Sequence, residues 1–239
     1  MTTPLYHYDS YTSSFRAKII GKDPENHAVL LDQTAFYPGG GGQPNDRGSM
    51  QVGQEIYPII KVRKLNNQIL HILGGESDLP EIGEEASCQV DWDLRYQLMR
   101  THTAMHILCG VIFRDYGASV TGGDMEPLNG RMDFEFETME KELVLEIEKA
   151  VNLEVKTARP VRTAILPREE AFKIPDLIRT KINLLPEGIN EIRIVEIVGL
   201  DLQADGGTHV KNTSEVGAIR IIDYKSKGKI NKRIYLQIE

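Results

Sequence analysis

The stretch DWDLRYQLMRTHTAMHILCGVIF, residues 91–113, divides the chain into two parts of different texture. Asp91 or Asp93 can cap a helix at its start, because a carboxylate accepts hydrogen bonds from the free N–H groups of a first turn. The apolar residues that follow recur at helical spacing: Leu94, Leu98, Met105, Ile112 and Phe113. Gly117, which lacks a Cβ and can adopt a left-handed conformation, predicts the end of the helix.

The residues before this helix predict a small β-barrel. Short runs rich in Val, Ile and Leu are separated by turn-forming stretches: Phe15–Ile20, Ala28–Leu31, Ile56–Val62 and Ile69–Leu73. Short strands with turns between them are typical of all-β barrels. We therefore predict a barrel-like domain with a glycine-rich loop over residues 1–90.

The residues after the helix predict an α+β domain over residues 91–239. A second helix is expected from Lys141 to Arg159, where Pro160 ends it. Strands are expected at Arg131–Glu137, Val161–Leu166, Ile192–Val198, Val216–Asp223 and Arg233–Ile238, the last two forming a hairpin. This order predicts a two-layer fold with helices on one face of a mostly antiparallel sheet.

Composition narrows the classes of protein that the chain can represent. Its 239 residues carry a formal net charge of −7, which disfavours non-specific coating of nucleic acid but permits a local basic patch. The longest nearly apolar run, Ile107–Phe113, is too short to span a bilayer, and Met1–Tyr11 lacks the features of a signal peptide. Two cysteines without a Cys-x-x-Cys motif exclude a disulfide framework and predict a reducing, cytoplasmic setting. Nothing in the sequence defines an oligomeric state.

Two distant motifs predict a metal site. His102 and His106 are four residues apart, so both imidazoles lie on one face of the predicted helix, one turn apart. Asp205-Gly-Gly-Thr-His209 offers a carboxylate and an imidazole in a loop whose two glycines can adopt backbone angles that other residues avoid. These four side chains make a plausible site with three nitrogen ligands and one oxygen ligand, for which zinc is the first candidate.

Two rival interpretations of the histidine pair fail on spacing. A metalloprotease needs His-Glu-x-x-His, whereas Thr103 follows the first histidine here and no acid lies between the two. Cys109 lies about 10 Å along the helix axis from His102, too far to share one tetrahedral ion with both histidines. We therefore expect Cys109 to be a small core residue.

The glycine run TAFYPGGGGQPNDRG, residues 34–48, has two interpretations. One is a flexible surface loop, since glycine and proline mark loops generally. The other is a loop whose backbone approaches a ligand closely, with Thr34 and Gln43 as polar groups. A phosphate-binding loop is excluded because Gly-Lys-Ser/Thr does not follow the run.

A short basic stretch near the C-terminus also has two interpretations. Its cations are Lys225, Lys227, Lys229, Lys232 and Arg233. If they lie together on a hairpin, these cations could contact the phosphates of a tRNA. Lysines at such positions also protect sheet edges from aggregation.

Three motifs in this order resemble one known family. They are Thr-Ala-Phe-Tyr followed by Gly-Gly-Gln at 41–43, His-x-x-x-His at 102–106, and Gly-Gly-Thr-His-Val at 206–210 followed by Asn-Thr-Ser-Glu-Val-Gly at 212–217. The pattern resembles the editing domain of alanyl-tRNA synthetases and the free-standing AlaX editing proteins. With its N-terminal glycine-rich part, the chain resembles the medium-length AlaX type.

The resemblance implies an activity and a set of site residues. These proteins hydrolyse the ester of tRNA(Ala) mischarged with serine or glycine and spare Ala-tRNA. Zinc would be held by His102, His106, Asp205 and His209, although the usual family residue at position 205 is cysteine. Thr34 would recognise the serine hydroxyl. The substrate pocket would further include Gly41, Gly42, Gln43 and Thr208, with Gln43 as the catalytic candidate.

The carboxylate at position 205 leaves the metal site with alternatives. A carboxylate binds zinc at about 2.0–2.2 Å, and a site with such a hard ligand can be weaker or accept another divalent ion. Zinc could activate a water or anchor the substrate, and four protein ligands favour anchoring because they leave no open position. A non-catalytic, metal-stabilised tRNA-binding module and a metal-dependent hydrolase of small esters remain as other functions.

Overall fold

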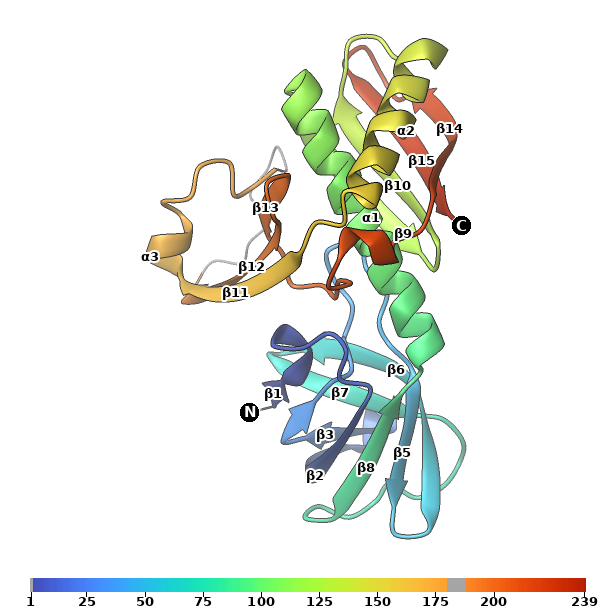
Figure 1. Cartoon of the computed structure of the whole chain (residues 1–239). Coiled ribbons are helices and arrows are strands. Elements are labelled where there is room, and N and C mark those ends of the chain that lie inside the picture. The colour runs from blue at the N-terminus through green and yellow to red at the C-terminus, as the bar shows by residue number, and fades with distance from the viewer. Residues whose placement is uncertain (1, 180–187) are drawn as a thin grey trace. The chain divides into compact units, whose positions relative to one another are not determined.

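The computed structural model describes residues 2–179 and 188–239 (Figure 1). The chain divides into two compact units, Met1–Tyr96 (unit 1) and Gln97–Glu239 (unit 2). Among the described residues, none of the helices is long and apolar enough to cross a membrane.

Unit 1 is a closed antiparallel barrel with the strand order β2-β3-β7-β6-β5-β8. Its strands are β2 (Ser14–Asp23), β3 (Ala28–Leu31), β5 (Gly48–Val52), β6 (Glu55–Leu65), β7 (Gln68–Leu73) and β8 (Glu85–Val90). A short parallel pair, β1 (Thr3–Pro4) with β4 (Gln33–Thr34), accompanies the barrel. The predicted barrel is confirmed.

Two barrel strands, β5 and β8, are absent from the sequence-based prediction. Only every second side chain is buried along β8, and in β5 only Met50 and Val52 are buried. In β8 the buried residues are Ala86, Cys88 and Val90, and two of these are small. Because strands of this kind lack runs of Val, Ile and Leu, a search for such runs passes over them.

The predicted long helix is confirmed as α1 (Trp92–Tyr116). Asp91 caps it, because its Oδ1 accepts the N–H of Leu94 at 3.2 Å. At the other end Gly117 has a φ of +65°, and its N–H donates to the carbonyl of Phe113 at 3.0 Å. The left-handed glycine that the sequence predicts therefore ends the helix.

The larger sheet of unit 2 is antiparallel throughout, with the order β14-β15-β10-β9. Its strands are β9 (Val120–Glu126), β10 (Asn129–Glu135), β14 (Ile219–Ser226) and β15 (Asn231–Ile238). The helix α2 (Lys141–Lys156) is held to it by the Asn152 amide, which bonds both the N–H and the carbonyl of Ile219. The predicted β14–β15 hairpin is confirmed.

The remaining strands of unit 2 form a second sheet rather than extending the first. Its order is β11 (Val161–Pro167), β12 (Glu191–Ile197) and β13 (Asp201–Ala204), all antiparallel. A short helix, α3 (Arg168–Ala171), follows β11. The sequence predicts the α+β class and most of these elements, but not β9, β13, α3 or the division into two sheets. The division matters because β13 leads directly into the loop that carries Asp205.

Candidate metal centre

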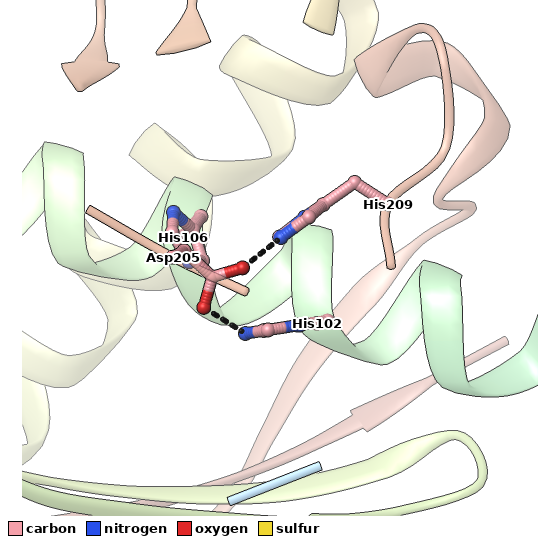
Figure 2. A group of neighbouring side chains, drawn as sticks. All are labelled: His102, His106, Asp205 and His209. Atoms are coloured by element: carbon pink, nitrogen blue, oxygen red, sulfur yellow. Dashed lines mark hydrogen bonds and ion pairs between the residues drawn. The ribbon is translucent and has the colours of Figure 1, made fainter. Parts of the chain in front are cut away.

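Four side chains from distant parts of the sequence converge in unit 2 (Figure 2). His102 and His106 come from α1, whereas Asp205 and His209 come from the loop after β13. Each offers one possible ligand atom, and these atoms all lie within 4.8 Å of one another. The centroid of the His209 ring lies 4.2 Å from that of the His102 ring and 4.7 Å from that of the His106 ring.

The Asp205 carboxylate lies between two of the imidazoles (Figure 2). Its Oδ2 is 3.1 Å from Nε2 of His209, and its Oδ1 is 3.5 Å from Nε2 of His102. The N–H of Gly207 also donates to Oδ2, at 2.7 Å. Gly206 and Gly207 are not among the glycines with a positive φ, so this loop contains no left-handed glycine. A side-chain hydrogen bond to Gly207 closes it instead.

Burial keeps two of the three imidazoles neutral. It lowers the pKa of His102 well below 6.5 and that of His209 to about 4. Burial lowers the pKa of His106 as well, but the hydrogen bond of Asp201 and the charges of Asp201 and Asp205 together outweigh it, so that the pKa of this imidazole is raised. Neutral imidazoles carry the free lone pair that a metal ligand needs.

Two outer contacts of the cluster have no counterpart in the sequence-based prediction. Nδ1 of His106 lies 3.0 Å from Oδ2 of Asp201, and Nδ1 of His209 lies 3.2 Å from the hydroxyl of Thr103. The same hydroxyl accepts the N–H of Val210 at 3.2 Å. These contacts leave the Nε2 atoms of His106 and His209 for the cluster itself. The only sequence signal is proximity, since Thr103 lies between the two helical histidines and Asp201 lies four residues before Asp205.

The donor set fits a metal ion. Three imidazoles and one carboxylate lie close together, and His102, His106 and His209 are buried. Cys109 is also buried, is unpaired and receives a hydrogen bond from the Gln203 amide, but it does not belong to the group. The cluster could therefore hold one cation with nitrogen and oxygen ligands.

The glycine run belongs to unit 1, where its four consecutive glycines all have positive φ. The values are +81°, +135°, +59° and +87° for residues 39–42. Side-chain-bearing residues rarely adopt such angles, so this backbone path requires glycine. Gly40 and Gln43 exchange backbone hydrogen bonds of 3.0 and 2.9 Å, and Gln43 is buried. The run is therefore a defined turn, with Gly41 and Gly42 at its tip.

Thr34 is fully buried in the barrel, where its hydroxyl contacts His71. Nδ1 of His71 is 3.3 Å from the carbonyl of Val29, which can only accept, so Nδ1 carries the proton. Burial lowers the pKa of His71 to about 4, so Nε2 is unprotonated at neutral pH and accepts the Thr34 hydroxyl at 2.8 Å. Since the N–H of Phe36 donates to Oγ1 at 3.1 Å, the hydroxyl can offer a further partner only an acceptor lone pair.

The remaining candidate residues have mixed environments. Thr208 is fully buried and directly precedes His209. In the basic stretch, Lys225 pairs with Asp223 at 2.9 Å and Arg233 with Asp133 at 2.6 Å. Lys232 is buried, and its Nζ donates to the carbonyls of Gly228 and Lys229. Lys227 and Lys229 lie on the exposed turn between β14 and β15.

Two family models match parts of the chain, one in each unit. Residues 192–235, which include Asp205 and His209, match the model described as "Threonyl and Alanyl tRNA synthetase second additional domain". Residues 11–94 match the model described as "tRNA synthetases class II (A)". Part of each unit is thus similar to a domain found in tRNA synthetases.

Full-length comparisons define the family. The chain is 39% identical over 241 residues to the alanyl-tRNA editing protein AlaX-M of Saccharolobus solfataricus, and all of both chains is covered. It is 37% identical over 243 residues to AlaX-M of Methanosarcina barkeri, covering 100% of this chain and 99% of that one. The chain is also 37% identical over 227 residues to the alanine–tRNA ligase of Ignicoccus hospitalis, and this alignment covers 92% of this chain but 24% of the ligase. The chain belongs to the AlaX-M family of alanyl-tRNA editing proteins.

Proposed function

We propose that this enzyme hydrolyses the ester that links serine, or glycine, to tRNA(Ala) and that it spares Ala-tRNA(Ala). The observation that carries the proposal is the buried group of His102, His106, Asp205 and His209 in a chain that matches AlaX-M over its full length. A cytoplasmic location is in keeping with two cysteines that are both unpaired.

Zinc is the metal we propose for the cluster, because three imidazoles and one carboxylate are ligands that zinc binds in tetrahedral sites. When bound, it would supply a Lewis acid that can accept the lone pair of the substrate's neutral α-amino group or polarise its ester carbonyl. Asp205 would hold its ligating oxygen in place through the bond that its other oxygen accepts from Gly207. Gln43 is the candidate for orienting the attacking water.

Serine selectivity is proposed to depend on Thr34. Because its hydroxyl proton is engaged by His71, Thr34 would accept a hydrogen bond from the serine hydroxyl of the substrate. Alanine has no hydroxyl to donate and would forgo this bond. Since Thr34 is fully buried, the contact requires that the residues covering it move aside when substrate binds.

The decisive experiment is deacylation of Ser-tRNA(Ala) and Ala-tRNA(Ala) by zinc-loaded protein, before and after chelation. We expect rapid release of serine, little release of alanine, and loss of activity on chelation that added zinc restores. Asp205→Cys should remain active, because a thiolate is also a zinc ligand. A seryl ester of a short RNA fragment is the control substrate.

Each alternative function predicts a different result. Hydrolysis of the fragment as fast as of the whole Ser-tRNA would favour a hydrolase of small esters. Binding of tRNA(Ala) without hydrolysis of either aminoacyl ester would contradict the editing proposal and favour a binding module. Lys227 and Lys229 would then be the first residues to test as contacts to the tRNA phosphates.

Replacing Thr34 by valine is expected to reduce the preference for serine over alanine by about five- to tenfold. This corresponds to the loss of one hydrogen bond of about 1–1.5 kcal/mol. Thr34→Ser keeps the hydroxyl and is the matched control, which should retain most of the preference. The ratio of kcat/KM for the two aminoacyl-tRNAs is the measurement. Equal ratios for wild type and Thr34→Val, with zinc still bound, would remove Thr34 from this role.

A further inference from the structure

Asp201, the first residue of β13, is a buried carboxylate next to the metal cluster but outside it. We propose that Asp201 is a positioning residue that holds His106 with Nε2 directed at the metal, a role that rests on the metal site proposed above. Its Oδ2 lies 3.0 Å from Nδ1 of His106, and its side chain has no exposed surface.

The contact defines which nitrogen of His106 can bind a metal. An ionised carboxylate only accepts hydrogen bonds, so Nδ1 must carry the proton that joins it to Asp201. The lone pair of a neutral His106 is then on Nε2, on the far side of the ring. A carboxylate behind a ligating imidazole keeps the ring in this tautomer and orientation and strengthens it as a donor.

The surroundings hold the Asp201 carboxylate in place. The Gln203 amide donates to Oδ2 at 2.7 Å, and Nε of Arg179 lies 3.5 Å from Oδ1. The Arg179 guanidinium stacks over the Phe113 ring at 3.6 Å from the ring centroid. Oδ1 is buried and accepts no hydrogen bond among the described residues. The orientation of the carboxylate therefore depends on the two hydrogen bonds that Oδ2 accepts, from His106 and from Gln203.

Gly110 brings the start of β13 close enough to α1 for this contact. A Cβ at Gly110 would lie 3.0 Å from Cβ of Asp201 and 2.9 Å from Cγ of Leu200. Real Cβ contacts are rarely this short, so a side chain here would push β13 away from the helix. Gly110 lies one helical turn after His106, on the same face, and its missing side chain is the reason that the carboxylate can reach the imidazole.

The test compares zinc affinity of wild type, Asp201→Asn and Glu154→Gln, measured by competition with a chelating dye. We expect Asp201→Asn to bind zinc about 10- to 100-fold more weakly, because an amide lacks the charge with which the carboxylate strengthens His106 as a donor. Glu154 is the matched control, because the exposure of the whole residue, backbone included, is 4% for both Glu154 and Asp201, but Glu154 pairs with Arg114 and Arg159. Glu154→Gln should bind zinc as wild type does.

A second measurement needs no substitution. Nitrogen-15 NMR of the zinc-loaded wild type should show His106 protonated on Nδ1, with a proton protected from exchange. A His106 protonated on Nε2, or equal zinc affinity of Asp201→Asn and wild type, would overturn the role of Asp201 while leaving the editing proposal intact. A wild type that binds no zinc would instead contradict the proposed metal site, and with it this role.

Discussion

Replacing Arg95 by methionine is expected to lower the free energy of unfolding of unit 1 by about 3–5 kcal/mol, because the change leaves a buried carboxylate unpaired. The guanidinium is completely buried. Its Nε lies 3.0 and 3.1 Å from the two carboxylate oxygens of Asp46. The two terminal nitrogens of the guanidinium donate to the carbonyls of Ser10 and Ala35. Methionine fills a similar volume but satisfies none of these acceptors.

The same change is expected to loosen the glycine run. Asp46 accepts the N–H of Tyr37 at 2.5 Å, and its own N–H donates to the carbonyl of Tyr37 at 2.9 Å. These two bonds close the base of the turn that contains residues 39–42. Arg95 thus holds together the ends of the segment in which Thr34 and Gln43 are proposed to contact substrate.

Denaturant unfolding followed by tryptophan fluorescence measures the Arg95 effect. Trp92 is the single tryptophan of the chain and lies in unit 1, stacked on Tyr96 at 5.6 Å between ring centroids. Arg47→Met removes an exposed cation from the same loop and should change the unfolding free energy by less than about 0.5 kcal/mol. Adding Asp46→Leu to Arg95→Met should recover part of the loss, since it removes the unpaired charge. Equal unfolding midpoints for Arg95→Met and Arg47→Met would contradict this account.

Replacing His209 by alanine is expected to abolish deacylation, with a loss in kcat/KM on the order of 10³-fold or more. Stabilisation by a bound metal is worth several kcal/mol, and about 4 kcal/mol corresponds to such a factor. His209 is buried, and its Nε2 contacts the Asp205 carboxylate at 3.1 Å, so its removal takes one donor from the cluster and leaves that carboxylate with one contact fewer.

Single-turnover deacylation and bound-zinc stoichiometry together measure the His209 effect. His27→Ala is the control, because His27 lies in unit 1 and bonds the carbonyls of Leu73 and Ser77. That variant should keep both zinc and activity. One equivalent of tightly bound zinc and unchanged serine release in His209→Ala would show that His209 is not a ligand.

The part of the site that can be predicted from sequence depends on local geometry. A helix places residues four apart on one face, so the pairing of His102 with His106 follows once the helix itself is recognised. The ends of α1 follow equally from local signals, the carboxylate of Asp91 and the left-handed Gly117. The β-barrel is recognisable because four of its strands are runs of Val, Ile and Leu.

Other parts of the site could not be predicted because their signals are not local. Asp201 is 95 positions from His106, and only the separate sheet of β11, β12 and β13 brings its carboxylate to that imidazole. The basic stretch is a similar case. Lysines and arginine that look equivalent in the sequence differ once β15 pairs with β10, since Arg233 then meets Asp133.

By itself, the sequence determined the fold class, the long helix and the pairing of His102 with His106, because hydrophobic periodicity, capping and helical spacing act within a few residues of each other. Only the tertiary structure decided which nitrogen of His106 faces the cluster, which group accepts the hydrogen bond of the Thr34 hydroxyl, and that Arg95 closes the glycine run. Each of these depends on a hydrogen bond between residues far apart in the chain. Such a partner is chosen by the packing of whole strands and helices, which no short stretch of sequence encodes.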